Sequence, residues 1–145
     1  MVEQLSVFLE NAPGRLAGMC RTLGAAGLNM RALMVAETGD YGVVRVLVDR
    51  PHAARAVLED AGFTASLTRV IAVEVPDRPG GLADVVEALG EHGLNVEYAY
   101  CYVEPAGDAA VYVFRVEDPD LAAKTLGDAG FGLAGAGRLY QPDAF

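Results

Sequence analysis

The segment Asn11-Ala12-Pro13-Gly14-Arg15-Leu16 is followed 66 residues later by a near copy, Asp77-Arg78-Pro79-Gly80-Gly81-Leu82. The same shift of 66 residues brings Gly27-Leu28-Asn29 onto Gly93-Leu94-Asn95. A pattern that returns at a fixed period indicates a structural unit that is duplicated along the chain. The fold can therefore be worked out for one copy and then applied to the other.

Further along, Ala61-Gly62-Phe63 matches Ala129-Gly130-Phe131 at a shift of 68, so the second copy carries two extra residues. The turn Pro105-Ala106-Gly107-Asp108 is the obvious place for them, because proline, glycine and aspartate favour turns. We expect two domains, residues 1–69 and residues 70–145, joined without a flexible linker.

Each copy contains the same series of strand and helix patterns. Alternating apolar residues predict strands, and apolar stripes at helical spacing predict helices. In the first copy we expect strands at 5–9, 30–37, 43–48 and 64–68, with helices at 14–26 and from 51 to about 62. In the second copy we expect strands at 71–75, 96–104, 110–116 and 133–140, with helices at 80–92 and from 119 to about 130. The order βαββαβ, found twice, predicts an α+β protein made of two tandem ferredoxin-like units.

The composition excludes several classes of partner. A net charge of −9, from 11 basic and 20 acidic residues, disfavours binding to nucleic acid. No apolar run reaches the ~18 residues of a membrane span, and the first residues lack the pattern of a signal peptide. These features predict a cytoplasmic protein that does not interact with membranes. The two cysteines and two histidines are not spaced for a disulfide framework or a metal site, so we expect no metal and no cofactor.

The turn between the first strand and the first helix is the strongest candidate for a binding site. Gly14 lacks a Cβ atom, which lets a ligand approach the backbone closely. The amides of Gly14, Arg15 and Leu16 have no acceptor within the expected helix and suit a carboxylate. Asn11 and Asp77 can accept hydrogen bonds from an ammonium group, although residues of these types also cap helices without binding a ligand.

The Gly-Leu-Asn segments supply a second candidate group. Asn29 and Asn95 each open a strand, and an asparagine side chain both donates and accepts hydrogen bonds, as a zwitterion requires. The structural alternative is an Asx turn, in which the side chain serves only its own backbone. The occurrence of both segments in both copies favours the functional interpretation.

With these motifs the chain resembles the ACT domains, the small regulatory modules of amino-acid metabolism. The Pro-Gly turns and Gly-Leu-Asn segments carry the resemblance, and two copies cover nearly the whole chain except residues 141–145. The resemblance implies that ACT units pair side by side into a shared antiparallel sheet with helices on one face. It also implies that an effector amino acid binds at the seam, between the Pro-Gly turn of one unit and the asparagine of its neighbour.

Carried over to this chain, the resemblance predicts two ligand sites that each use both copies. One site would join the turn of the first copy to Asn95, and the other would join the turn of the second copy to Asn29. The two sites are not equivalent, because Asp77 stands where the first copy has Asn11. The expected ligand-binding residues are Asn11, Ala12, Pro13, Gly14, Arg15, Leu16, Asn29, Met30, Asp77, Arg78, Pro79, Gly80, Gly81, Leu82, Asn95 and Val96.

These features predict a non-catalytic regulatory sensor that binds a free L-amino acid between its two ACT units and acts on an enzyme of amino-acid metabolism. One alternative is a protein-interaction module with a vestigial pocket. Another is a small enzyme, although no nucleophile or acid–base pair occurs at the spacing of a known motif. A third is RNA binding through the row Tyr98, Tyr100 and Tyr102, which the acidic charge opposes. The same row and a hydrophobic content of 52% predict a homodimer or higher oligomer.

Overall fold

A computed structural model describes residues 1–102 and 109–144 of the chain, and the expected turn from Pro105 to Asp108 lies outside the described residues. The chain divides into two compact units, which we call the first unit and the second unit. The first unit consists of Glu3–Thr68 with Ala136–Phe145, and the second unit consists of Met1–Val2 with Arg69–Gly135. The long strand β4 runs without a break from the first unit into the second.

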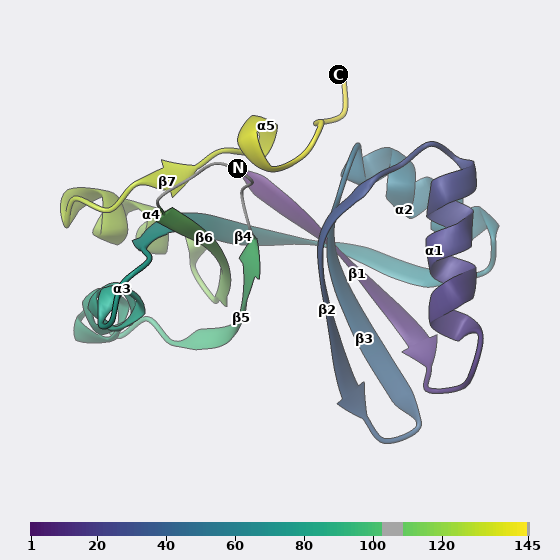
Figure 1. Cartoon of the computed structure of the whole chain (residues 1–145), viewed down its shortest axis with the longest axis horizontal. Coiled ribbons are helices and arrows are strands. Elements are labelled where there is room, and N and C mark those ends of the chain that lie inside the picture. The colour runs from purple at the N-terminus through teal and green to yellow at the C-terminus, as the bar shows by residue number, and fades with distance from the viewer. Residues whose placement is uncertain (103–108, 145) are drawn as a thin grey trace. The chain divides into compact units, whose positions relative to one another are not determined.

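The first unit has the expected βαββαβ order (Figure 1). Strand β3 pairs antiparallel with both β1 and β2, and the strands are ordered β2-β3-β1-β4. The edge position of β2 follows from this order. The elements are β1 (Val2–Glu10), α1 (Arg15–Ala25), β2 (Met30–Thr38), β3 (Tyr41–Val48), α2 (Pro51–Asp60) and β4 (Thr64–Pro76).

The second unit repeats this arrangement. The second part of β4 is flanked by β6 and β7, because Ala72 pairs with Val113 on one edge and with Ala134 on the other. Strand β5 pairs with β6, so the order β5-β6-β4-β7 reproduces that of the first unit. Its further elements are α3 (Gly81–Glu91), β5 (Val96–Tyr102), β6 (Ala109–Val116), α4 (Pro119–Asp128) and β7 (Leu133–Ala134).

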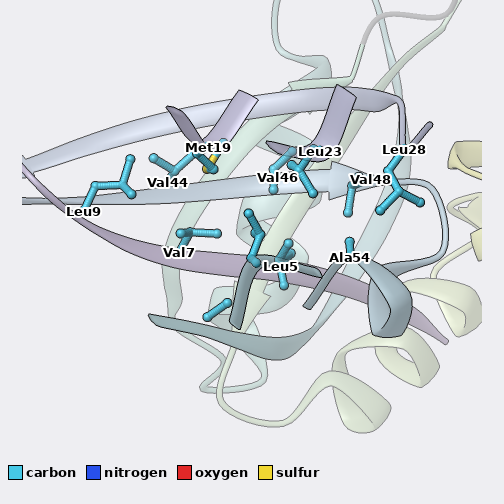
Figure 2. Packing of buried hydrophobic residues seen from close by; sticks show 12 residues of the cluster. Leu5, Val7, Leu9, Met19, Leu23, Leu28, Val44, Val46, Val48 and Ala54 are labelled. Atoms are coloured by element: carbon cyan, nitrogen blue, oxygen red, sulfur yellow. The ribbon is translucent and has the colours of Figure 1, made fainter. Parts of the chain in front are cut away.

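Each unit has a core between its helices and one face of its strands. In the first unit, Leu5 and Val7 point toward Met19 and Leu23 of α1, and all four are 0% exposed (Figure 2). Alternate strand residues therefore face the helices, as the period of two along a strand requires. The second unit has the equivalent cluster, with Val73, Val85, Leu89, Phe114 and Leu126 at its centre. The structure thus confirms the α+β fold of tandem ferredoxin-like units.

The end of the chain differs from expectation. We expected a strand over 133–140, but β7 covers only Leu133–Ala134 and a short helix, α5 (Ala136–Leu139), follows. Gly135 and Gly137 weaken a strand because they have no side chains to pack and lose more backbone entropy. Residues from Ala136 onward belong to the first unit, where Tyr140 is 5% exposed and its hydroxyl accepts a hydrogen bond from the Glu3 amide at 2.9 Å.

None of the described helices is both long enough and apolar enough to cross a membrane.

Candidate functional site: the Pro-Gly turns and the helices they start

The two Pro-Gly turns have the same backbone conformation. In the first turn, the Ala12 amide donates to the Glu10 carbonyl at 2.9 Å, and the Arg15 amide donates to the Ala12 carbonyl at 3.3 Å. The equivalent bonds of the second turn join Arg78 to Pro76 at 2.9 Å and Gly81 to Arg78 at 3.0 Å. The duplicated sequence therefore produces a duplicated turn.

Glycine is required at the helix start because of its backbone angle. Gly14 and Gly80 precede α1 and α3 with φ of 88° and 84°, in the left-handed region that other residues adopt only with strain. A Cβ atom added at Gly14 would meet no atom within 4 Å. The backbone at Gly14 therefore borders open space in which a ligand can lie.

Each turn presents amides that the chain does not use. Within the described residues, the amides of Gly14, Leu16 and Ala17 have no acceptor, and neither do those of Gly80, Leu82 and Ala83. We expected the Arg15 amide to be free as well, but the hydrogen bond to Ala12 occupies it. The free amides lie at the positive end of a helix, which favours a negatively charged group.

The polar residues before the turns do not cap the helices. The side-chain nitrogen of Asn11 donates to the Gly39 carbonyl at 2.9 Å, and the backbone amide of Asn11 donates to the Asp40 carbonyl at 2.7 Å. Asn11 is therefore fixed to the β2–β3 hairpin. No described side chain caps α1 or α3, because glycine holds the cap position in both. The bond from the side-chain nitrogen leaves the Asn11 Oδ1 atom as an acceptor.

The charges around the two turns differ. The Arg15 guanidinium lies 5.1 Å from the centre of the Phe63 ring, and the first turn of α1 contains no acidic residue. The Arg78 guanidinium instead pairs with Asp84 at 3.0 Å and also donates to the Pro79 carbonyl at 3.3 Å. The second turn therefore carries an arginine that is already paired with a carboxylate.

The second turn is also tighter than the first. Gly81 is buried, and a Cβ atom there would collide with the carbonyl oxygen of Pro76. The first copy has Arg15 at the equivalent position, which has a Cβ atom. Outside Gly81 the turn residues are exposed, and Leu16 and Leu82 are each 38% exposed.

The structure places the two asparagines away from the turns of their own units. Asn29 and Asn95 are exposed and directly precede β2 and β5, whose first residues, Met30 and Val96, are half-buried. Asn95 lines a hollow of about 480 Å³ together with Glu97, Glu117 and Asp118. Helix α1 has 11 residues, so Asn29 lies roughly 16 Å along the helix axis from the Pro-Gly turn. One unit therefore does not bring its own turn and its own asparagine together.

Groups for catalysis are sparse in the described part of the chain. Within it, no three histidine, cysteine, aspartate or glutamate side chains gather closely enough to hold a metal ion. Burial, reinforced by the charge of Asp77, raises the pKa of the Cys101 thiol, which makes it a poor nucleophile. Tyr100 is 9% exposed and Tyr98 and Tyr102 are half-buried, so the row is not an open aromatic surface of the kind that stacks on RNA bases.

Sequence analysis missed one group of polar contacts. Asp49, Arg50 and the start of α2 contact Gln141 and Asp143, which lie in the segment that no motif covered. The local sequence contains one indication of these contacts: Arg50 precedes Pro51 at the helix start, where a residue that caps the helix, such as serine or aspartate, is usual.

Comparison with known proteins agrees with this architecture. A family model described as an ACT domain pair matches residues 1–128. The structure of protein BT0572 from Bacteroides thetaiotaomicron is 34% identical, with a TM-score of 0.89, and the match covers 96% of this chain and 95% of that one. The ligand-free regulatory subunit of aspartate kinase from Thermus thermophilus shares the fold at 18% identity and a TM-score of 0.64, over 88% of this chain and 92% of that one.

The Thermus flavus regulatory subunit of aspartate kinase gives a similar result, with 17% identity and a TM-score of 0.58 over 88% of this chain and 91% of that one. No curated protein matches the chain. The repeated turn, the duplicated strand order and the family match lead to one conclusion: this chain belongs to the ACT domain family, as a tandem pair of ACT domains.

Proposed function

We propose that this ACT domain pair is a non-catalytic regulatory protein that binds a free L-amino acid. The observation that carries the proposal is the Pro-Gly turn, which leaves the Leu16 and Ala17 amides without acceptors at the start of α1. Amides at a helix N-terminus bind carboxylates because the free N–H groups and the helix dipole both favour negative charge. A carboxylate is the group that all free amino acids share.

The first turn is the better carboxylate site. No acidic residue lies in the first turn of α1, whereas Asp84 lies in the first turn of α3 and Asp77 precedes it. Like charges near an anion weaken its binding. The Arg78 guanidinium offsets this repulsion only in part, because it is already paired with Asp84. We therefore propose that the first turn binds the ligand more tightly than the second.

The ammonium group of the ligand needs acceptors, and we propose that one of them comes from a neighbouring unit. The Oδ1 atom of Asn11 is one acceptor, and the other proposed partner is the asparagine of a second ACT unit. The 11-residue length of α1 supports this requirement, because an amino acid is far shorter than the roughly 16 Å between a turn and its own asparagine. Asn95 is proposed to serve the first turn and Asn29 the second.

The regulated partner is proposed to be an enzyme of amino-acid metabolism. The likeness to regulatory subunits of aspartate kinase supports a partner of this class. We further propose that the protein is cytoplasmic and that it assembles as a homodimer or larger oligomer. The competing function is a protein-interaction module whose pocket no longer binds a ligand.

A thermal-shift screen with the twenty standard amino acids tests the proposal. A ligand present at a hundred times its Kd stabilises the folded protein by about 2.7 kcal/mol, which raises Tm by several degrees. We expect at least one L-amino acid to do so, and its D-enantiomer serves as the matched control. No shift with any of the twenty at millimolar concentration would favour the interaction module.

A further inference from the structure

Residues 141–143 lie against the start of α2 in the first unit. The Asp143 carboxylate accepts from the His52 amide at 2.9 Å and from the Ala53 amide at 3.1 Å. Gln141 pairs through its backbone: its carbonyl accepts from the Arg50 amide at 2.6 Å, and its amide donates to the Asp49 carboxylate at 2.8 Å. Four hydrogen bonds therefore hold residues 141–143 against the start of α2, which is about 90 positions earlier in the sequence.

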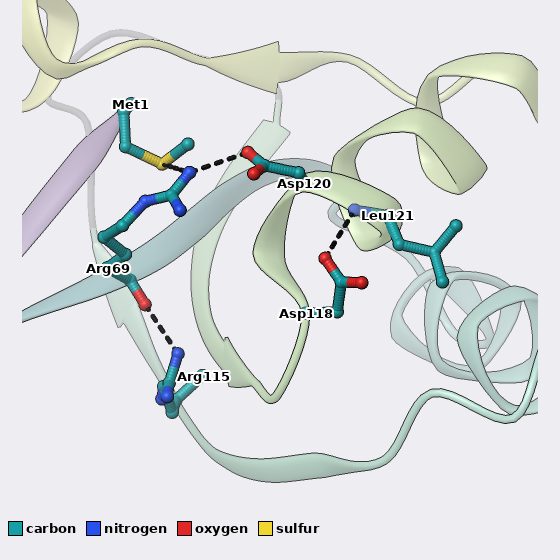
Figure 3. Close-up of polar contacts among 6 residues, drawn as sticks. All are labelled: Met1, Arg69, Arg115, Asp118, Asp120 and Leu121. Carbon is teal, nitrogen blue, oxygen red and sulfur yellow. Dashed lines mark hydrogen bonds and ion pairs between the residues drawn. The ribbon is translucent and has the colours of Figure 1, made fainter.

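Helix α2 has no cap of its own. Arg50 occupies the cap position with φ of 48°, and its side chain makes no cap hydrogen bond. In the second unit the equivalent residue is Asp118, whose carboxylate accepts from the Leu121 amide at 3.1 Å (Figure 3). The first amides of a helix need an acceptor from outside the helix. The cap of α2 is thus the distant residue Asp143, whereas the cap of α4 is Asp118, which directly precedes the helix.

The rest of the site is built to hold a peptide backbone. Asp49 is 6% exposed, and the Arg31 guanidinium binds both of its oxygens, at 3.1 and 3.2 Å. This pair fixes the carboxylate that receives the Gln141 amide. At the equivalent place in the second unit, the hollow beside Asn95 is lined by Glu97, Glu117 and Asp118, which would repel an acidic segment.

We propose that Asp49, Arg50 and the first turn of α2 form a binding site for an extended acidic peptide, and that residues 141–143 occupy it as a removable internal ligand. The ligand chemistry is a backbone amide and carbonyl on one residue and a carboxylate two residues later. The segment follows Gly135, where the second unit ends, and belongs to the first unit together with the residues that it contacts. This site is separate from the Pro-Gly turns and does not depend on amino-acid binding there.

Amide hydrogen exchange of the full chain tests the proposal. In D143A, the His52 and Ala53 amides lose their acceptor and have none within α2, so we expect both to exchange about ten- to a hundredfold faster. D128A is the matched control, because Asp128 pairs with Lys124 on an exposed helix face and has no other partner among the described residues. We expect D128A to leave both amides unchanged.

A second experiment separates a binding site from a merely local contact. In the full chain with Gln141, Pro142 and Asp143 all replaced by glycine, the segment loses the Asp143 carboxylate and becomes more flexible, so an added peptide can displace it from the site. The added peptide acetyl-Gln-Pro-Asp-amide should then restore protection of the two amides, and acetyl-Gln-Pro-Asn-amide should restore less. Unchanged exchange in D143A, or no protection by the Asp peptide at several millimolar, would overturn the proposal.

Discussion

Asp49 shows how a single buried charge is stabilised in this fold. Burial by itself raises the pKa of Asp49, but hydrogen bonds from Arg31 and from the backbone amides of Gln141 and Asn29 outweigh burial. The pKa of Asp49 in the folded protein therefore lies below its ordinary value of 3.8. A carboxylate with a lowered pKa stabilises the folded state above the unfolded pKa, and this contribution is lost as the pH falls through the folded pKa.

The prediction is that D49N lowers the free energy of unfolding at pH 7 by about 1.5–3 kcal/mol, since a hydrogen-bonded charge is replaced by a neutral amide. The difference from the unmutated protein should shrink below about pH 4, where Asp49 itself becomes protonated. Urea unfolding at pH 7 and near pH 3 measures both values. An equal loss at the two pH values would show that the charge of Asp49 is not what stabilises the fold.

The helices and strands were largely predictable from the sequence, because their patterns are local. The duplicated glycines marked the turns, and the apolar alternation placed the strands within a few residues. The prediction of a strand over 133–140 was wrong, because β7 ends before Gly135 and the residues from Ala136 onward belong to the first unit. The contacts of Gln141 and Asp143 were not predictable, because no local pattern relates residues about 90 positions apart.

For the candidate site, the sequence identified the two turns and the replacement of Asn11 by Asp77, but not the side-chain contacts that distinguish the turns. The free amides follow from helix geometry, which sequence reasoning can supply. The pairing of Arg78 with Asp84, the stacking of Arg15 on Phe63 and the link from Asn11 to Gly39 depend on side-chain placement. They became visible only in the structure.

Gly81, the first residue of α3, has no space for a side chain, and this predicts the effect of replacing it. G81A forces a Cβ atom onto the Pro76 carbonyl, so the turn must shift, and we expect a loss of about 1–3 kcal/mol. Gly18, inside α1, has ordinary space beside Phe63, with 3.7 Å from a built Cβ atom to the ring. G18A should therefore stabilise the protein by about 0.5–1 kcal/mol through helix propensity. Thermal unfolding of both variants checks the signs, and a stabilised G81A would contradict the described turn.

At the scale of the whole molecule, the edge strand β2 predicts that two or more copies of the chain associate. Within the described residues β2 pairs only with β3, and its residues Leu33 and Val35 are 44% and 51% exposed. An open edge with apolar side chains is a template for pairing with another chain. We expect sedimentation to show a species heavier than the 15.2 kDa chain, and V35K to shift it toward the monomer.

The matched control is L121K, at a leucine of α4 that is 45% exposed. It adds the same charge on a helix and not on strand β2, so it should leave the assembly unchanged. A single species of about 15 kDa at micromolar concentration for the unmutated chain would refute assembly.

Calorimetric titration of the stabilising amino acid tests the central claim most directly. Asparagine tolerates positive φ, so G14N keeps the turn while placing a side chain where the ligand carboxylate should lie. We predict that G14N and N95A weaken the same, tighter site by roughly ten- to a hundredfold, and that N29A and G80N act on the other. If G14N and N29A affected one site while G80N and N95A affected the other, each pocket would belong to a single unit. Full affinity at both sites in G14N would contradict the account, because the ligand would then not bind at the Pro-Gly turn.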